Sequence, residues 1–141
     1  MDNLGSISIE YNESKVNLIE CGFLDFEQIL RASNYLYLPY TYISFEQLIQ
    51  LNAKKIYTGV MNLTEKNLVD FVEMWKAGKI PAKTYVWLWT KTEFNKFSKL
   101  KNLSDNVEKS ISTVLKFQKP KEKLTMEMLD SNYISFTFKK S

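Results

Sequence analysis

The sequence predicts a single α/β domain over residues 1–141, built as a short leucine-rich-repeat-like arc: a mostly parallel sheet with helices on one face. Two observations carry this prediction. A strand, a helix and a second strand follow one another between residues 55 and 90, an order that normally makes the strands parallel with a right-handed crossover. A helix followed by a strand also recurs along the chain, as in solenoids with one strand and one helix per repeat.

The clearest predicted helix follows Leu63. Thr64 is a suitable N-cap because its hydroxyl can accept a bond from a first-turn amide, and Glu65 suits the positive end of the helix dipole. Gly78 fits a left-handed C-terminal position, and Pro81 prevents the helix from continuing. One apolar stripe should face the core, formed by Leu68, Phe71, Val72 and Trp75.

β-Branched and aromatic residues predict strands on both sides of this helix, at 55–58 and 84–89. Upstream, FEQIL at 26–30 recurs as FEQLI at 45–49, and residues 63–88 form a third, longer helix-then-strand unit. The repeat is loose, so chance similarity between two amphipathic helices remains the alternative.

The remaining N-terminal elements are shorter. We expect a half-buried strand at 6–11, a possible strand at 16–21, a helix at 26–32 capped by Asp25, and a strand at 35–38 that ends at Pro39.

Beyond residue 90, the segment 91–101 is predicted as a polar helix or loop. Ser104 should cap a helix over 104–117, and 119–123 should be a charged, solvated loop. The last strand is expected at 133–138, with alternate residues on its buried face: Ile134, Phe136 and Phe138.

The segment 45–89 resembles the nematode F-box-associated domain of the second type. The matching residues are Leu48, Ile49, Leu51, Asn52, Lys55, Ile56, Leu63, Thr64, Lys66, Leu68, Phe71, Val72, Trp75, Gly78 and Pro81. Ala77, Lys79 and Ile80 depart from the family pattern, and Tyr85 stands where leucine is common. The resemblance implies the substrate-recognition region that follows an F-box in a ubiquitin-ligase subunit. No F-box is recognisable before residue 6, so we expect the recognition module alone, an F-box-less relative or an excised domain.

Composition narrows the function. The chain has no histidine, one cysteine (Cys21, expected to be a buried, inert thiol) and a net charge of +3, and all basic residues except Arg31 are lysines. This disfavours histidine-based catalysis, most zinc sites, disulfides and nucleic-acid recognition. No stretch reads as a signal peptide or membrane span. We therefore expect an intracellular protein, cytoplasmic or nuclear, without cofactor or metal, that binds neither nucleic acid nor membrane.

The candidate binding site is aromatic. Val86 and Leu88 match Leu36 and Leu38 and suit the helix side of the sheet, so the alternate residues should share the opposite side. Those candidate partner-binding residues are Tyr35, Tyr37, Tyr85, Trp87 and Trp89. The alternative is that these rings face a second layer of the same domain, such as the predicted 104–117 helix.

These features predict a non-catalytic protein-binding module that resembles the substrate-recognition domain of F-box proteins. A small antidote or inhibitor that neutralises one partner protein is the alternative, and an enzyme that uses only Asp, Glu, Lys, Tyr or Ser is a third hypothesis. The sequence does not name the partner or the oligomeric state.

Overall fold

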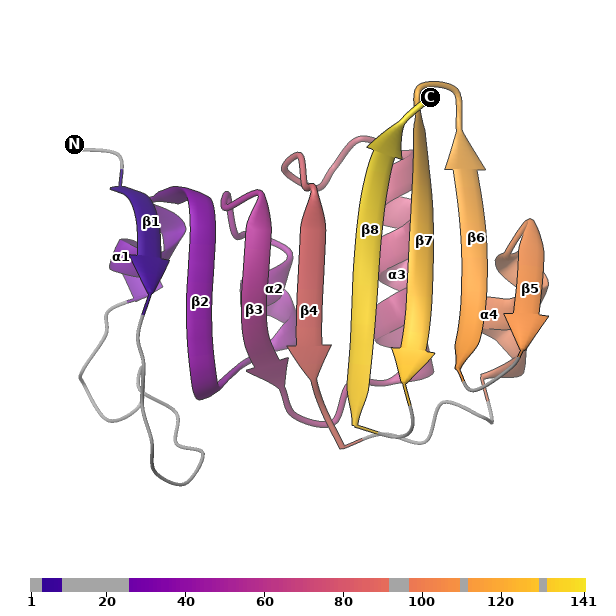
Figure 1. Cartoon of the computed structure of the whole chain (residues 1–141), viewed down its shortest axis with the longest axis horizontal. Coiled ribbons are helices and arrows are strands. Elements are labelled where there is room, and N and C mark those ends of the chain that lie inside the picture. Colours follow the sequence, from indigo (N-terminus) through magenta and orange to yellow (C-terminus); the bar gives the residue numbers. More distant parts are fainter. Residues whose placement is uncertain (1–3, 9–25, 92–96, 110–111, 130–131) are drawn as a thin grey trace.

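The computed structural model describes residues 4–8, 26–91, 97–109, 112–129 and 132–141. They form one eight-stranded sheet in the order β1-β2-β3-β4-β8-β7-β6-β5 (Figure 1). The elements in chain order are β1 (Leu4–Ser8), α1 (Phe26–Leu30), β2 (Ala32–Ile43), α2 (Phe45–Leu48), β3 (Lys55–Val60), α3 (Glu65–Lys76), β4 (Tyr85–Trp89), α4 (Ser98–Leu103), β5 (Asn106–Lys109), β6 (Thr113–Lys119), β7 (Glu122–Leu129) and β8 (Tyr133–Lys140).

The predicted leucine-rich-repeat-like arc is wrong, because the sheet is mixed. Strands β1 to β4 pair in parallel, whereas β4 pairs with β8, β8 with β7, β7 with β6 and β6 with β5 in antiparallel fashion. We call β1–β4 the parallel half and β5–β8 the antiparallel half. The antiparallel half is built from strands that a short turn can join, so it needs no crossover helix and does not continue the helix-then-strand order.

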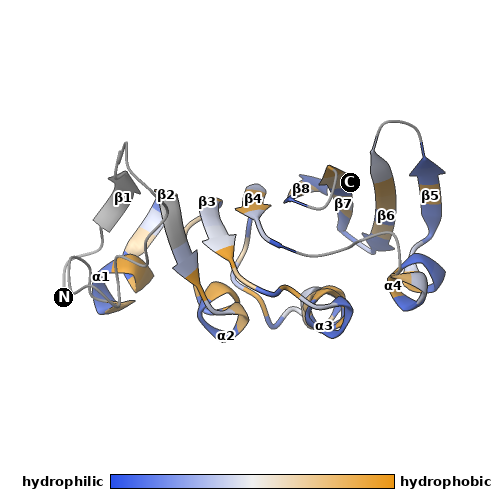
Figure 2. Cartoon of the chain, turned by 90° about the horizontal axis from the view of Figure 1, so that it is seen from below, coloured by the Kyte–Doolittle hydropathy of each residue, from blue (hydrophilic) through white to orange (hydrophobic). Residues whose placement is uncertain are grey.

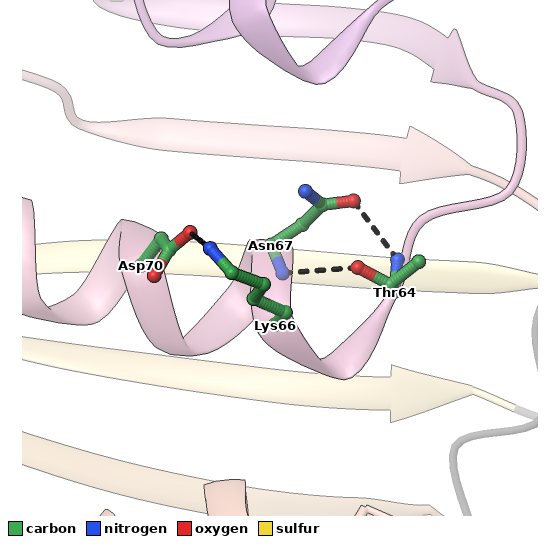
Figure 3. A network of polar contacts seen from close by, with 4 residues as sticks. All are labelled: Thr64, Lys66, Asn67 and Asp70. Atoms are coloured by element: carbon green, nitrogen blue, oxygen red, sulfur yellow. Dashed lines mark hydrogen bonds and ion pairs between the residues drawn. The ribbon is translucent and has the colours of Figure 1, made fainter.

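In the parallel half, the helix over 65–76 is confirmed. The Asn67 N–H donates to Thr64 Oγ1 at 3.1 Å, and the Thr64 N–H donates to Asn67 Oδ1 at 3.0 Å, which closes a capping box (Figure 3). One turn further, Lys66 pairs with Asp70 at 2.7 Å. Gly78 has a φ of 71°, the left-handed conformation that the sequence predicted at the helix end.

Strand β2 does not end at Pro39 as predicted, but runs from Ala32 to Ile43. The pairing with β3 shifts register between Tyr37 and Tyr42, so Pro39 lies where the ladder is already interrupted. A proline has no N–H to give to the ladder and is tolerated at such an irregularity. The predicted strand over 16–21, the cap at Asp25 and the thiol of Cys21 lie outside the described residues.

The predicted helix over 104–117 is also wrong. Helix α4 ends at Leu103, and Ser104 is its C-cap, with the hydroxyl donating to the Lys101 carbonyl at 2.6 Å. Strands β5 and β6 follow. The predicted loop over 119–123 is reduced to a tight turn at Pro120 and Lys121, because Lys119 already pairs with Glu122.

The core lies between the sheet and the helices, which all lie on the same side of the strands (Figure 2). As predicted, Val86, Leu88, Leu36 and Leu38 are buried, and so are the three alternate residues of β8: Ile134, Phe136 and Phe138. They pack with the α3 stripe, for example Phe71 against Phe136 with ring centroids 4.9 Å apart. None of the helices in the described part of the chain is long and apolar enough to cross a membrane.

A polar cluster joins α3 to the antiparallel half. Trp75 Nε1 donates to Glu122 Oε1 at 2.5 Å, and Lys119 Nζ donates to the Trp75 carbonyl at 2.7 Å. The same ammonium lies 4.7 Å from the Trp75 ring centroid, in cation–π range. Helix α3, which connects two strands of the parallel half, is therefore held to the β6–β7 hairpin by hydrogen bonds and a cation–π contact.

Candidate functional site

The candidate site lies on the side of the sheet away from the helices, which we call the open face. Because successive strand residues point to opposite sides, each core residue of a strand alternates with one on the open face. Among the described residues, no second layer covers this face: residues 106–109 and 113–119, expected within a covering helix, are strands of the same sheet. The proposed second-layer alternative therefore fails for that segment.

Strand register brings the tyrosines and tryptophans of the parallel half together. Tyr37 pairs with Tyr57, and Tyr57 with Trp87, so the three rings form one row across β2, β3 and β4. Tyr37 and Tyr57 have ring centroids 4.9 Å apart, and the Tyr57 and Trp87 rings are nearly parallel at 6.3 Å. The Trp87 ring also contacts the Tyr133 ring on β8, with centroids 5.5 Å apart.

We call the whole cluster the aromatic face. Its members are Tyr35, Tyr37, Tyr42, Tyr57, Tyr85, Trp87, Trp89 and Tyr133. All five residues predicted from the sequence are among them. Tyr42, Tyr57 and Tyr133 were missed, although Tyr57 and Tyr133 lie in strands that the sequence predicted.

Trp89 supports the face rather than presenting its ring to solvent. It is only 3% exposed, because its indole lies over Gly59 on the neighbouring strand. A Cβ at Gly59 would meet Trp89 Nε1, and would come within 2.7 Å of both Trp89 Cε2 and Tyr42 Cδ1. A side chain at position 59 would therefore displace the Trp89 indole. The glycine allows the Trp89 ring to pack against the Tyr57 ring, with centroids 5.2 Å apart.

The other rings are within reach of a partner. Tyr35 is 36% and Tyr133 37% exposed, and five further rings are half-buried: Tyr37, Tyr42, Tyr57, Tyr85 and Trp87. The Trp87 indole nitrogen is buried and has no hydrogen-bond partner among the described residues, so packing alone holds that ring. Because they are half-buried and contact one another, we expect these rings to be ordered before a partner binds.

Tyr85 marks the boundary with the antiparallel half. Its hydroxyl bonds with Ser135 on β8. Burial raises the pKa of Tyr85, and the nearby Glu127 carboxylate raises it further, while the bond to Ser135 acts in the opposite direction. The phenol is therefore neutral at physiological pH and can both donate and accept a hydrogen bond.

The part of the chain that the structure describes gathers no group of three or more His, Cys, Asp or Glu side chains that could hold a metal ion. The expectation that the protein is not an enzyme stays a prediction.

The family model described as F-box associated matches residues 25–88, without an accompanying F-box. The resemblance predicted from the sequence is thus confirmed over residues 25–88, which make up less than half of the chain. This segment spans α1 to β4 and holds six of the eight residues of the aromatic face on β2, β3 and β4, all except Trp89 and Tyr133. The family points to a protein-binding role in general. No curated protein and no solved structure matches the chain.

Proposed function

We propose that this protein is a non-catalytic module that binds another protein through the aromatic face and serves as the substrate-recognition part of an F-box ubiquitin ligase. The observation that carries the proposal is the continuous row of Tyr37, Tyr57 and Trp87, extended by Tyr133, on a sheet face that no described element covers.

The energetics favour such a role. Tyrosine and tryptophan bring large, rigid contact area with few rotatable bonds, and they dominate binding hot spots for that reason. Here they are fixed by register and by each other, so little side-chain freedom remains to be lost on binding. The absence of histidine from the whole sequence, which removes the commonest general acid/base, supports a binding role over a catalytic one.

The protein-binding claim is tested by affinity capture from cells of the source organism, with partners identified by mass spectrometry. We compare the wild type with Trp87→Ala and with Lys76→Ala, an exposed position on the last turn of α3 on the other side of the sheet. A genuine partner should be captured by Lys76→Ala as well as by the wild type. Trp87→Ala should lose it, because truncating a hot-spot ring weakens binding by about 2 kcal/mol or more. Equal capture by all three proteins would contradict the proposal.

The ubiquitin-ligase claim needs a separate experiment. We join an F-box segment to residue 1 and reconstitute the ligase with its adaptor, cullin and conjugating enzyme. The captured partner should then be ubiquitinated by the wild-type chimera and spared by the Trp87→Ala chimera. Binding without ubiquitination would leave a binding protein of another kind, such as an inhibitor, as the better description.

A further inference from the structure

The open face of the antiparallel half differs in chemistry from the aromatic face. Its residues along the β7–β8 pair are polar between Lys123 and Glu127: Thr137 pairs with Thr125, Ser135 with Glu127, and Lys139 with Lys123. Thr137 also pairs with Tyr85, so this polar surface continues directly from the aromatic face across the β4–β8 seam.

Two lysines meet directly across that surface. Lys123 on β7 and Lys139 on β8 are opposite each other, both are exposed, and neither has an ion pair among the described residues. Like charges at directly opposed positions destabilise a sheet. The pair therefore lowers the stability of the free protein, and an anion placed between the two ammonium groups would remove that cost.

Among the described residues, no acidic group of this surface forms an ion pair with Lys123 or Lys139. Glu108 is bound to Lys116 at 3.1 Å, and the Asp105 carboxylate accepts the Gln118 N–H at 2.8 Å. Glu127 lies one row beyond Thr125, beside Tyr85 and Ser135. Lys55, exposed and paired in register with Tyr85, adds another positive charge near the aromatic face.

A shallow cavity of about 300 Å³ adjoins Lys123. The polar residues that line it are Asp105, Asn106, Lys116, Gln118, Lys123 and Thr125. Its amide, hydroxyl and ammonium donors are groups that receive a carboxylate, and the Asp105 carboxylate lies among them.

We infer that the open face binds one extended segment of the partner protein, with large apolar side chains at one end and acidic side chains at the other; this rests on the proposed function. The apolar side chains lie on the row Tyr37, Tyr57 and Trp87, and the carboxylates lie at Lys123 and Lys139. Strand spacing of about 4.8 Å and a rise of about 3.4 Å per residue place Tyr57 and Lys123 roughly 20 Å apart. An extended chain covers that distance in about six residues.

The aromatic and basic groups of the open face lie apart, which favours an extended protein segment over a single-stranded nucleic acid. A nucleic acid alternates a base with a phosphate at every nucleotide, so its sites interleave aromatic and basic groups along one track. Here only Lys55 lies among the rings, while the lysine pair stands at the far end of the face, beyond Thr125 and Thr137. The one arginine of the chain, Arg31, lies outside strand β2.

The test begins with a random twelve-residue peptide library displayed on phage and selected against the wild type. Enriched peptides should carry aspartate or glutamate about six residues from proline, leucine or an aromatic residue. The best peptide is then synthesised with a fluorophore, and its Kd is measured by anisotropy at low and high salt. A glutamine-for-acid version of the same peptide is measured beside it.

The chain supplies a matched control for the lysines. Lys123→Gln with Lys139→Gln should weaken the acidic peptide about fivefold to tenfold, whereas Lys121→Gln with Lys140→Gln should leave its Kd unchanged. The control removes the same charge from the neighbouring turn and from the other side of β8. Neither pair should affect the glutamine version.

Three results would overturn the inference: no enriched peptide, enriched peptides without acids, or equal losses with both lysine pairs. Tighter binding of a twelve-nucleotide single strand than of the best peptide would overturn it in favour of nucleic acid. Failure of the proposed function has a different signature, because Trp87→Ala would then change neither peptide binding nor partner capture. Loss of binding in Trp87→Ala without any lysine effect would retain the proposed function and reject the acidic segment.

Discussion

The two halves of the sheet share one core but are assembled by different rules. In the parallel half, each strand is connected to the next through a helix, and the F-box-associated match covers these elements from α1 to β4. In the antiparallel half, β6 and β7 are joined by a tight turn, and α3 of the parallel half packs against β8 (Figure 1). Both halves bury apolar residues toward the helices, whereas their open faces are aromatic in one half and lysine-bearing in the other. Core and contact surface are therefore specified independently, on alternate residues of the same strands.

The largest predicted effect concerns Trp75, whose side chain joins helix α3 to the antiparallel half. Trp75→Ala should lower the free energy of unfolding by about 3–5 kcal/mol, because it removes a large buried side chain and the donor to Glu122. Urea denaturation measures the loss. Trp75→Phe is the control, since it keeps an aromatic ring in the stripe while losing the indole N–H and part of the ring volume, and it should cost less. Unfolding of Trp75→Ala at the wild-type midpoint would show that α3 does not join the halves in this way.

The next effect lies within the parallel half. Gly59→Ala should destabilise by up to about 3 kcal/mol, because the added methyl group displaces the Trp89 indole and the Tyr42 ring. The near-ultraviolet circular dichroism of the tryptophans should change with it. A second substitution, Trp89→Leu, should recover part of the loss by vacating the space. Wild-type stability and an unchanged spectrum in Gly59→Ala would mean that Trp89 does not rest on this glycine.

A smaller effect comes from a buried lysine that forms a hydrogen bond within the parallel half. Lys83 is 7% exposed and donates to the Leu51 carbonyl ahead of β3. Burial lowers the pKa of Lys83 from 10.5 to about 8. The unfolded chain therefore binds more protons than the folded one between these two pH values, so stability increases as pH rises through 8.

The increase attributable to Lys83 between pH 7 and pH 9.5 should be about 2 kcal/mol. Below pH 7 the lysine is charged in both states and contributes no slope. Urea denaturation across this range should show the increase in the wild type and its absence in Lys83→Met. Because the two proteins share all their other titratable groups, the difference between their slopes reports on Lys83. Identical slopes in the two proteins would place the Lys83 ammonium in solvent.

The parallel half was largely predictable because its signals are local. The capping box at Thr64 and the apolar stripe through Trp75 fix α3 without reference to other strands. In the antiparallel half the last strand was predicted, but β5 and β6 were misread as a helix because Val107, Val114 and Leu115 fit a helical stripe, and pairing between strands decided otherwise. The alternation of Leu124, Met126 and Met128 is the signal that could have identified β7.

For the site, alternation along β4 was sufficient to place Tyr85, Trp87 and Trp89 on one side. The burial of Trp89 depends on Gly59 in the adjacent strand, and the opposed lysines depend on the β7–β8 register. Each of these pairings joins two different strands, so neither can be predicted from one stretch of sequence. The predicted residues thus located the face, and the structure supplied its neighbours and its charged end.

The most direct test of the central claim is the unfolding free energy of Trp87→Ala beside that of Trp75→Ala. If the aromatic face is a contact surface, Trp87→Ala should cost no more than about 1.5 kcal/mol, because it loses ring contacts with Tyr57 and Tyr133 while removing a buried, unpaired N–H. Trp75→Ala should cost two to three times as much. A loss in Trp87→Ala as large as that in Trp75→Ala would make Trp87 part of the core and contradict the account.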